Sequence, residues 1–150
     1  MVMATENMSE LSLELGRAMT EMKNYLRQFI QSKIKEHNIS LTFEMLEILA
    51  CLWQQDGINQ QELADKTIKD KSSMTYLVDN LVKRGMVKRV ADKNDRRNNL
   101  IFLTKEAKLL QKKLYPWVFE MYDKATHEVK VADIKKSITL IKKMNKNLRG

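Results

Sequence analysis

The sequence has few residues that break helices, since its 150 residues include four glycines and one proline, Pro116. This scarcity predicts long helices joined by few loops. The single cysteine, Cys51, excludes an intrachain disulfide and fits a reducing compartment. No secretory signal is visible, because Glu6 and Glu10 lie where an apolar block would be needed. The longest apolar run, residues 48–53, is far shorter than the roughly 20 residues of a membrane span. We therefore expect one cytoplasmic, mainly helical domain.

Basic residues are in excess, and the excess is concentrated in one part of the chain. The net charge is +8, from 27 Lys and Arg against 19 Asp and Glu. Residues 1–65 carry a net charge of −5, residues 66–113 carry +9 and residues 114–150 carry +4. Positive charge favours a polyanionic partner, and a uniformly solvated basic surface would spread the charge evenly. The middle third is therefore where we expect such a partner to bind.

Apolar residues at helical spacing predict long helices at both ends of the chain. Over residues 9–37 they recur every three or four positions in one narrow stripe. A second helix is expected to begin after Thr42, whose hydroxyl can cap it, and its apolar residues on most sides predict a central position. Thr104 is expected to cap another long helix, which Pro116 kinks rather than breaks because the stripe continues in phase. The last helix is expected over residues 131–147.

Two short helices are predicted in the middle of the chain. Asn59 and Glu62 have the spacing of a capping box and predict the start of the first one. A turn over residues 68–69 follows, and Asp70 is expected to cap the second helix, which Gly85 ends with a positive φ. Its predicted apolar face consists of Met74, Leu77, Val78, Leu81 and Val82. Two short helices joined by a tight turn are typical of a helix-turn-helix.

Beyond Gly85 the apolar pattern changes from helical to extended. Two β-prone runs, residues 86–91 and 100–103, flank a polar tip over residues 92–99, which predicts a β-hairpin. A helix-turn-helix followed directly by a hairpin is a winged helix. We therefore predict a mainly α fold with a small β-hairpin wing, in which residues 42–104 form a winged helix-turn-helix DNA-binding domain.

The hairpin tip contains the most specific string in the chain, Asp92-Lys93-Asn94-Asp95-Arg96-Arg97, and the following strand leads to Leu103-Thr104. Here the sequence resembles the MarR (multiple antibiotic resistance regulator) family of bacterial transcription factors, whose wing reads Asp-x-Arg-Asp-x-Arg and leads into Leu-Thr. The resemblance also covers residues 61–64 and 78–87, and by motif it spans about residues 41–107. One departure is Asn94, which stands where the family usually has the first wing arginine.

Helical phase identifies the DNA-reading candidates on the second short helix. With the apolar face turned to the core, Tyr76 and Lys83 point outward. The first turns of a recognition helix enter the major groove, where hydroxyl and ammonium groups reach base edges. The candidates are Lys71, Ser72, Ser73, Thr75, Tyr76 and Lys83. The alternative is that Ser72 and Ser73 only stabilise the first turn beside its capping residue.

The hairpin supplies a second group of candidates, Arg89, Lys93, Asn94, Asp95, Arg96 and Arg97. Arg97 on a short tip suits a narrow, electronegative minor groove, and Asp95 is expected to hold its guanidinium in place. The alternative is an ordinary solvated turn, in which these residue types are common. Along the flanking DNA backbone we expect phosphate contacts from Gln60, Gln61, Arg84 and Lys88.

The terminal helices have more apolar surface than a winged helix can cover. Residues 9–37 and 105–150 are therefore expected to form a dimerisation region, which would set two recognition helices one DNA turn apart. The interface candidates are Leu11, Leu15, Trp117, Met121, Ile138 and Ile141. The alternative is that each of them belongs to the core of the monomer.

Other residues point to no enzyme chemistry. Helical phase places Cys51 between Glu44 and Glu47, whose carboxylates are expected to raise the thiol pKa and leave it inert. His37 and His127 have no second ligand at metal-binding spacing. No nucleophile with a base, phosphate loop or paired carboxylates is present. We expect neither an enzyme, nor a metal site, nor a cofactor.

Together these patterns and the resemblance predict a homodimeric regulator of transcription that binds double-stranded DNA at a near-palindromic operator. The resemblance implies a repressor whose DNA affinity falls when a small, aromatic or anionic ligand binds. Three alternatives stay open: a sequence-tolerant architectural winged helix that binds DNA or RNA, a protein-interaction module, and a redox-responsive regulator.

Overall fold

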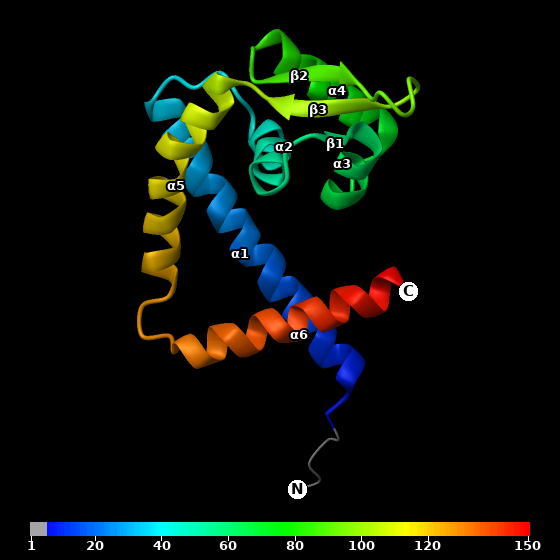
Figure 1. Cartoon of the computed structure of the whole chain (residues 1–150). Coiled ribbons are helices and arrows are strands. Elements are labelled where there is room, and N and C mark those ends of the chain that lie inside the picture. Colours follow the sequence, from blue (N-terminus) through cyan, green and yellow to red (C-terminus); the bar gives the residue numbers. More distant parts are fainter. Residues whose placement is uncertain (1–5) are drawn as a thin grey trace, which may run out of the picture. The chain divides into compact units, whose positions relative to one another are not determined.

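The computed structural model describes residues 6–150 and has the predicted order of elements, with one additional short strand (Figure 1). The helices are α1 (Met8–Glu36), α2 (Phe43–Gln54), α3 (Gln60–Thr67), α4 (Lys71–Lys83), α5 (Lys105–Ala125) and α6 (Val131–Arg149). The strands β1 (Ile58–Asn59), β2 (Val87–Ala91) and β3 (Asn99–Leu103) form an antiparallel sheet in the order β1-β3-β2. The predicted mainly α fold with a β-hairpin wing is confirmed.

Capping residues begin the helices where the sequence indicates. Ahead of α2, Thr42 Oγ1 accepts a hydrogen bond from the N–H of Met45 at 3.2 Å. At α3, Asn59 Oδ1 accepts from the N–H of Glu62 at 2.8 Å, while the Asn59 amide donates to the Glu62 carboxylate at 2.9 Å. Gly85, with φ of +69°, follows α4 and lets the chain turn into β2. These local signals set the lengths of the two helices that make up the helix-turn-helix.

Strand β1 extends the predicted hairpin to a three-stranded sheet. Ile58 pairs with Ile101, and Asn59 pairs with Leu100, so the start of α3 is tied to the wing strand β3. The sequence analysis missed β1 because a strand of two residues is too short to show alternating hydrophobicity.

Gly57 lies directly before β1 with φ of +70°, and a Cβ there would be 2.6 Å from the Phe102 ring. The substitution Gly57→Ala is expected to lower the free energy of unfolding by about 1–2 kcal/mol, because the side chain is strained at this φ and displaces the ring. Denaturant unfolding measures the loss. The matched control is Gly16→Ala, in open space inside α1, which should raise stability by about 0.5–1 kcal/mol. An unchanged midpoint for Gly57→Ala would contradict this account.

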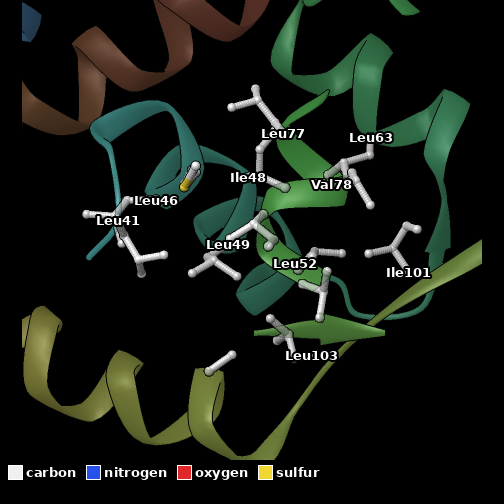
Figure 2. Packing of buried hydrophobic residues seen from close by; sticks show 14 of the residues in the cluster. Leu41, Leu46, Ile48, Leu49, Leu52, Leu63, Leu77, Val78, Ile101 and Leu103 are labelled. Carbon is white, nitrogen blue, oxygen red and sulfur yellow. The ribbon is translucent and has the colours of Figure 1, made fainter. Parts of the chain in front are cut away.

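The core lies where α2, α3, α4 and the sheet meet (Figure 2). Helix α2 is central, as predicted, and its residues Ile48, Leu49 and Leu52 have no exposed surface. Val78 of α4 and Ile101 of β3 are also fully buried. Burying an aliphatic side chain of this size contributes about 1.5–3 kcal/mol. This packing holds one face of α4 inward and therefore fixes which residues face outward.

One residue of the predicted apolar face is not buried. Val82 is 37% exposed, whereas Met74, Leu77, Val78 and Leu81 are buried. At about 100° per residue, the buried four lie within about 60° of the Met74 direction, while Val82 lies about 80° away. The prediction for Val82 is therefore wrong, because the apolar face is narrower than the sequence suggests.

The chain divides into two compact units, the first ending at Val118 and the second comprising Phe119–Gly150. The boundary falls inside α5, shortly after Pro116, and the kink expected at this proline stays a prediction. Within the second unit, α6 has no buried residue. The division into a winged domain and dimerisation helices also stays a prediction. No helix within residues 6–150 has both the length and the apolar composition that crossing a membrane requires.

Candidate nucleic-acid interface

The first turn of α4 is held by Asp70, as predicted. Its carboxylate accepts a hydrogen bond from the backbone N–H of Ser73 at 2.7 Å and another from the Ser73 hydroxyl at 3.1 Å. The N–H of Ser73, followed by its hydroxyl, lowers the pKa of Asp70. The Ser73 hydroxyl therefore stabilises the first turn, as the alternative proposed, and a DNA contact of Ser73 stays a prediction. Ser72 is exposed.

The remaining candidates on α4 form an outward surface. Lys71, Tyr76 and Lys83 are exposed, and Tyr76 retains 67% of its accessible surface. Thr75 is also exposed, but its hydroxyl donates to the Lys71 carbonyl at 2.9 Å and accepts from the Gln60 amide at 3.0 Å. The outward surface thus consists of the Tyr76 phenol, the Ser72 hydroxyl and the ammonium groups of Lys71 and Lys83. The hydrogen bond between Thr75 and Gln60 connects this surface to the start of α3.

The turn between α3 and α4 contains a strained residue. Ile68 has φ of +51° and ψ of +54° and is 91% exposed. We expect Ile68→Gly to raise the free energy of unfolding by about 0.5–1 kcal/mol, because glycine removes the left-handed strain while little apolar burial is lost. Thermal unfolding measures the gain. Ile68→Ala keeps a Cβ and serves as the control with no comparable gain, and a destabilised glycine variant would exclude strain at this position.

Backbone contacts of two aspartates shape the wing tip. Asp92 accepts a hydrogen bond from the N–H of Asn94 at 3.0 Å, and Asp95 accepts from the N–H of Arg97 at 3.0 Å. The Asp95 carboxylate also accepts from the Asn98 amide at 3.3 Å. Within residues 6–150, Asp95 contacts Arg97 only through the backbone N–H of Arg97. The expectation that Asp95 holds the Arg97 guanidinium is therefore wrong. The two-residue separation favours an Asx-type turn, which leaves the Arg97 side chain free to reach outward.

Arg97 lines a polar pocket of about 230 Å³ that joins the wing to the helix-turn-helix. The lining residues are Gln60, Gln61, Ala64, Lys71, Met74, Arg97, Asn98 and Asn99. The pocket therefore brings together a predicted recognition-helix residue, the predicted tip arginine and both predicted phosphate-binding glutamines. Two cationic side chains and several amides at one place form a surface suited to a phosphate group.

Two predicted DNA-contacting arginines have partners inside the chain. Arg89 Nη2 lies 2.5 Å from Asp79 Oδ1, so an ion pair connects strand β2 to helix α4. Arg84 donates through Nε to the carbonyl of Ser40 at 2.7 Å and through Nη1 to the Asn80 side chain at 3.0 Å. These contacts orient the recognition helix relative to the wing and to the segment before α2. DNA contacts of Arg84 and Arg89 stay predictions.

The ion pair between Asp79 and Arg89 should contribute measurably to stability. Denaturant unfolding of Asp79→Ala, Arg89→Ala and the double variant is expected to give a coupling free energy of about 0.5–1 kcal/mol. The value is small because the two side chains are 49% and 28% exposed, respectively, and solvent screens their attraction. The control cycle pairs Asp79→Ala with Lys88→Ala, whose effects should be additive. If the effects of Asp79→Ala and Arg89→Ala are additive, the ion pair contributes nothing to the free energy of unfolding.

The other predicted contacts lie on the surface. Lys88, Lys93, Asn94 and Arg96 are exposed. The Gln61 amide donates to Asp65 Oδ1 at 2.9 Å within α3. Sequence reasoning missed Asn98 and Asn99 of the pocket, and it did not assign Asp79. The asparagines directly follow the wing string, which was the available signal, whereas nothing in the local sequence connects Asp79 to the strand after Gly85.

The dimer candidates differ in how much of each side chain the monomer covers. Leu11 and Ile138 are 44% and 49% exposed. Leu15, Met121 and Ile141 are half-buried. Trp117 is half-buried too, because it packs against the core and its ring centroid lies 4.4 Å from that of His37. The monomer core therefore accounts for part of the Trp117 surface and for little of Leu11 or Ile138.

Burial raises the pKa of the Cys51 thiol, whereas the positive charge of the nearby Lys66 ammonium lowers it by a smaller amount. The predicted direction is confirmed, but its cause is burial rather than the carboxylates of Glu44 and Glu47. Glu44 pairs with Arg27, and Glu47 lies 3.2 Å from Lys23 and 3.7 Å from Lys69. These cations offset the carboxylate charges. A thiol with a raised pKa is a weak nucleophile at neutral pH.

Comparison with known proteins agrees with this geometry. Residues 41–98 match the model of the MarR family. The regulator TtmR of Methylorubrum extorquens, described as HTH-type, is 31% identical over 74 residues, which are 49% of this chain and 38% of TtmR. SarZ of Staphylococcus haemolyticus, with the same description, is 30% identical over 93 residues, which are 60% of this chain and 62% of SarZ. The chain thus matches less than two thirds of the length of either relative.

A solved structure extends the match beyond the winged helix. A MarR transcriptional regulator from Methanosarcina mazei Go1 is 26% identical and has a TM-score of 0.77, with 89% of this chain and 94% of that chain covered. The winged helix, the wing string and these matches together identify residues 41–98 as a winged-helix domain of the MarR family.

Proposed function

We propose that this protein regulates transcription by binding double-stranded DNA as a homodimer. The observation that carries the proposal is the pocket between the starts of α3 and α4 and the wing tip, where Lys71 and Arg97 meet the amides of Gln60 and Gln61. Three segments that are separate in sequence supply phosphate-binding groups at one place. A solvated hairpin without a binding role would not require cationic and amide side chains from three segments to line one pocket.

Base reading is assigned to the exposed surface of α4. Ser72 and Tyr76 lie in its first two turns, and their hydroxyls can donate to or accept from base edges in the major groove. Arg97 has the planar, delocalised cation that suits a narrow minor groove. Lys83, Lys88 and the other exposed cations around α4 supply salt-sensitive affinity for the DNA backbone.

Dimerisation is proposed from the uncovered apolar surface of the terminal helices. Leu11 on α1 and Ile138 on α6 are each more than two fifths exposed, and α6 has no buried residue. A monomer rarely leaves apolar helix faces of this length in water, and a second copy is the simplest cover. Two-fold symmetry would then pair two recognition helices with the two half-sites of a near-palindrome.

The resemblance to the family supports two finer parts of the proposal. The regulator acts as a repressor, and a small aromatic or anionic ligand lowers its DNA affinity. Such release requires the ligand to bind the DNA-incompetent arrangement of the dimer more tightly than the competent one. The raised pKa of the half-buried Cys51 thiol argues against oxidation as the signal.

The test compares a duplex enriched by the protein from random sequences with a scrambled duplex of equal length and composition. At physiological salt the enriched duplex should bind about 10³-fold more tightly or better. Equal affinity for both duplexes would support the architectural alternative, in which sequence-independent contacts dominate. Absence of binding to either duplex at low salt would support a protein-interaction module.

A further inference from the structure

Helix α6 differs from the other long helices in its charge. It contains six basic residues and one acidic residue, Asp133, over Val131–Arg149. Helix α1, in contrast, contains five basic and four acidic residues over Met8–Glu36. A helix that only needs solubility is served by mixed signs, as in α1. The strong excess of basic residues on α6 therefore calls for a different explanation.

Five lysines of α6 share one side of the helix. At about 100° per residue they fall within a sector about 120° wide, while the apolar side chains Ile134, Ile138 and Ile141 lie on the other side. We call the basic side the lysine face, which consists of Lys135, Lys136, Lys142, Lys143 and Lys146. The same helix thus has one face suited to a second copy of the chain and another suited to an anion.

Within Phe119–Gly150, no ion pair neutralises the charges of the lysine face. All five lysines are exposed, and none of the ion pairs found over residues 6–150 involves α6. Lys142 and Lys146 are four residues apart, where like charges repel and destabilise a helix. An anionic partner that approaches this face would relieve the repulsion.

We propose that the lysine face is a second, sequence-independent binding site for the phosphate backbone of duplex DNA. The stripe from Lys135 through Lys142 to Lys146 extends about 16 Å along the helix, at 1.5 Å per residue. Duplex DNA carries one negative charge per 1.7 Å of its axis, both strands counted, so a segment of this length contains about ten phosphates, and those on the near side face the stripe. The three ammonium groups can therefore each find a phosphate without a particular base sequence.

An anionic membrane is the other polyanion to consider, and the second face of the helix argues against it. A helix that lies on a membrane buries its apolar face between lipids. The apolar face of α6, with Ile138 and Ile141, is proposed to contact a second copy of the chain. In such a dimer only the lysine face stays free, and a rigid polyanion such as DNA can use it without apolar insertion.

The experiment first saturates the protein with a short enriched duplex and then adds a labelled duplex of unrelated sequence. Fluorescence anisotropy at several salt concentrations measures binding of the second duplex, with an expected Kd of about 10⁻⁴–10⁻⁶ M near physiological salt. The variant Lys135→Gln/Lys142→Gln/Lys146→Gln should reduce the slope of log K against log salt by about three. Its affinity for the first duplex should stay unchanged.

The control variant Lys108→Gln/Lys112→Gln/Lys113→Gln removes the same charge from exposed positions of α5 and should keep second-duplex binding. Failure of the wild-type protein to bind a second duplex, or an unchanged salt slope in the α6 variant, would overturn the inference. Lysine-dependent binding to phosphatidylserine vesicles without binding to the second duplex would overturn it in favour of a membrane. If the protein binds unrelated duplex through α6 but shows no preference for an enriched duplex, the lysine face is supported as a DNA-binding site, whereas the proposed function is contradicted.

Discussion

Replacing Ile138 and Ile141 of α6 by aspartate is expected to convert the dimer into monomers and to reduce affinity for a palindromic operator by about 10²–10⁴-fold. Ile138 is 49% exposed in the monomer, so a charge there is tolerated by the isolated chain but not by an apolar interface. The large effect on DNA follows because two linked recognition helices bind with an avidity that one helix lacks. Analytical ultracentrifugation and operator titration measure the two effects.

The matched control for this substitution is Thr139→Asp/Asn147→Asp, which adds the same charge to exposed positions away from the apolar face of α6. This variant should remain dimeric and keep its affinity for a short operator duplex. Circular dichroism checks that both variants keep their helices. A variant that carries both isoleucine substitutions and still sediments as a dimer would contradict the assignment of α6 to the interface.

Replacing Arg97 by alanine should weaken operator binding by about 1–3 kcal/mol and reduce the salt slope by about one. The side chain lines the pocket between wing and helix-turn-helix and is exposed at the hairpin tip. Its loss removes a cation from the minor groove or the adjacent phosphates, while the tip keeps its shape because Asp95 binds the backbone N–H. Titrations of the enriched duplex at several salt concentrations measure both quantities.

Arg96→Ala is the neighbouring control for Arg97→Ala. Arg96 is also exposed on the hairpin tip but does not line the pocket, so we expect a smaller loss of affinity. Equal effects of the two substitutions would indicate that the tip contributes general positive charge. Unchanged affinity in Arg97→Ala would remove the wing from the binding mechanism.

Signals between residues close in sequence predicted much of the fold. Asn59 and Asp70 cap α3 and α4 through contacts to residues three positions later, and such spacings are visible without a structure. Gly85 ends α4 for the same local reason. The hairpin was predictable because both of its strands are long enough to show the extended pattern. These features place the outward surface of α4, from which the candidate base contacts were derived.

Contacts between distant segments were not predictable in the same way. Asp79 and Arg89 come together because α4 ends and the chain reverses at Gly85, so their pairing depends on the tertiary arrangement. The bond from Arg84 to the Ser40 carbonyl joins segments 44 residues apart. In both cases the sequence identified a basic residue beside the DNA surface but gave no sign of an internal partner.

The environment of Cys51 shows how neighbouring charges can mislead a prediction from helical phase. Phase correctly placed Glu44 and Glu47 on the same side of α2, yet cations from α1 and from the turn before α4 pair with both carboxylates. Burial then becomes the main influence on the pKa of the thiol. Phase describes a single helix, whereas a pKa depends on every element that packs against it.

Selection of preferred duplexes from a random pool tests the central claim most directly, because the enriched sequences reveal base preference, symmetry and half-site spacing together. We predict enrichment of a near-palindrome whose half-sites lie about one helical turn apart, about 10–10.5 base pairs from centre to centre, as expected for two recognition helices related by a two-fold axis. Enrichment should be lost with the dimer-breaking α6 variant. A pool that stays random, or that yields one asymmetric motif without a second half-site, would contradict the account.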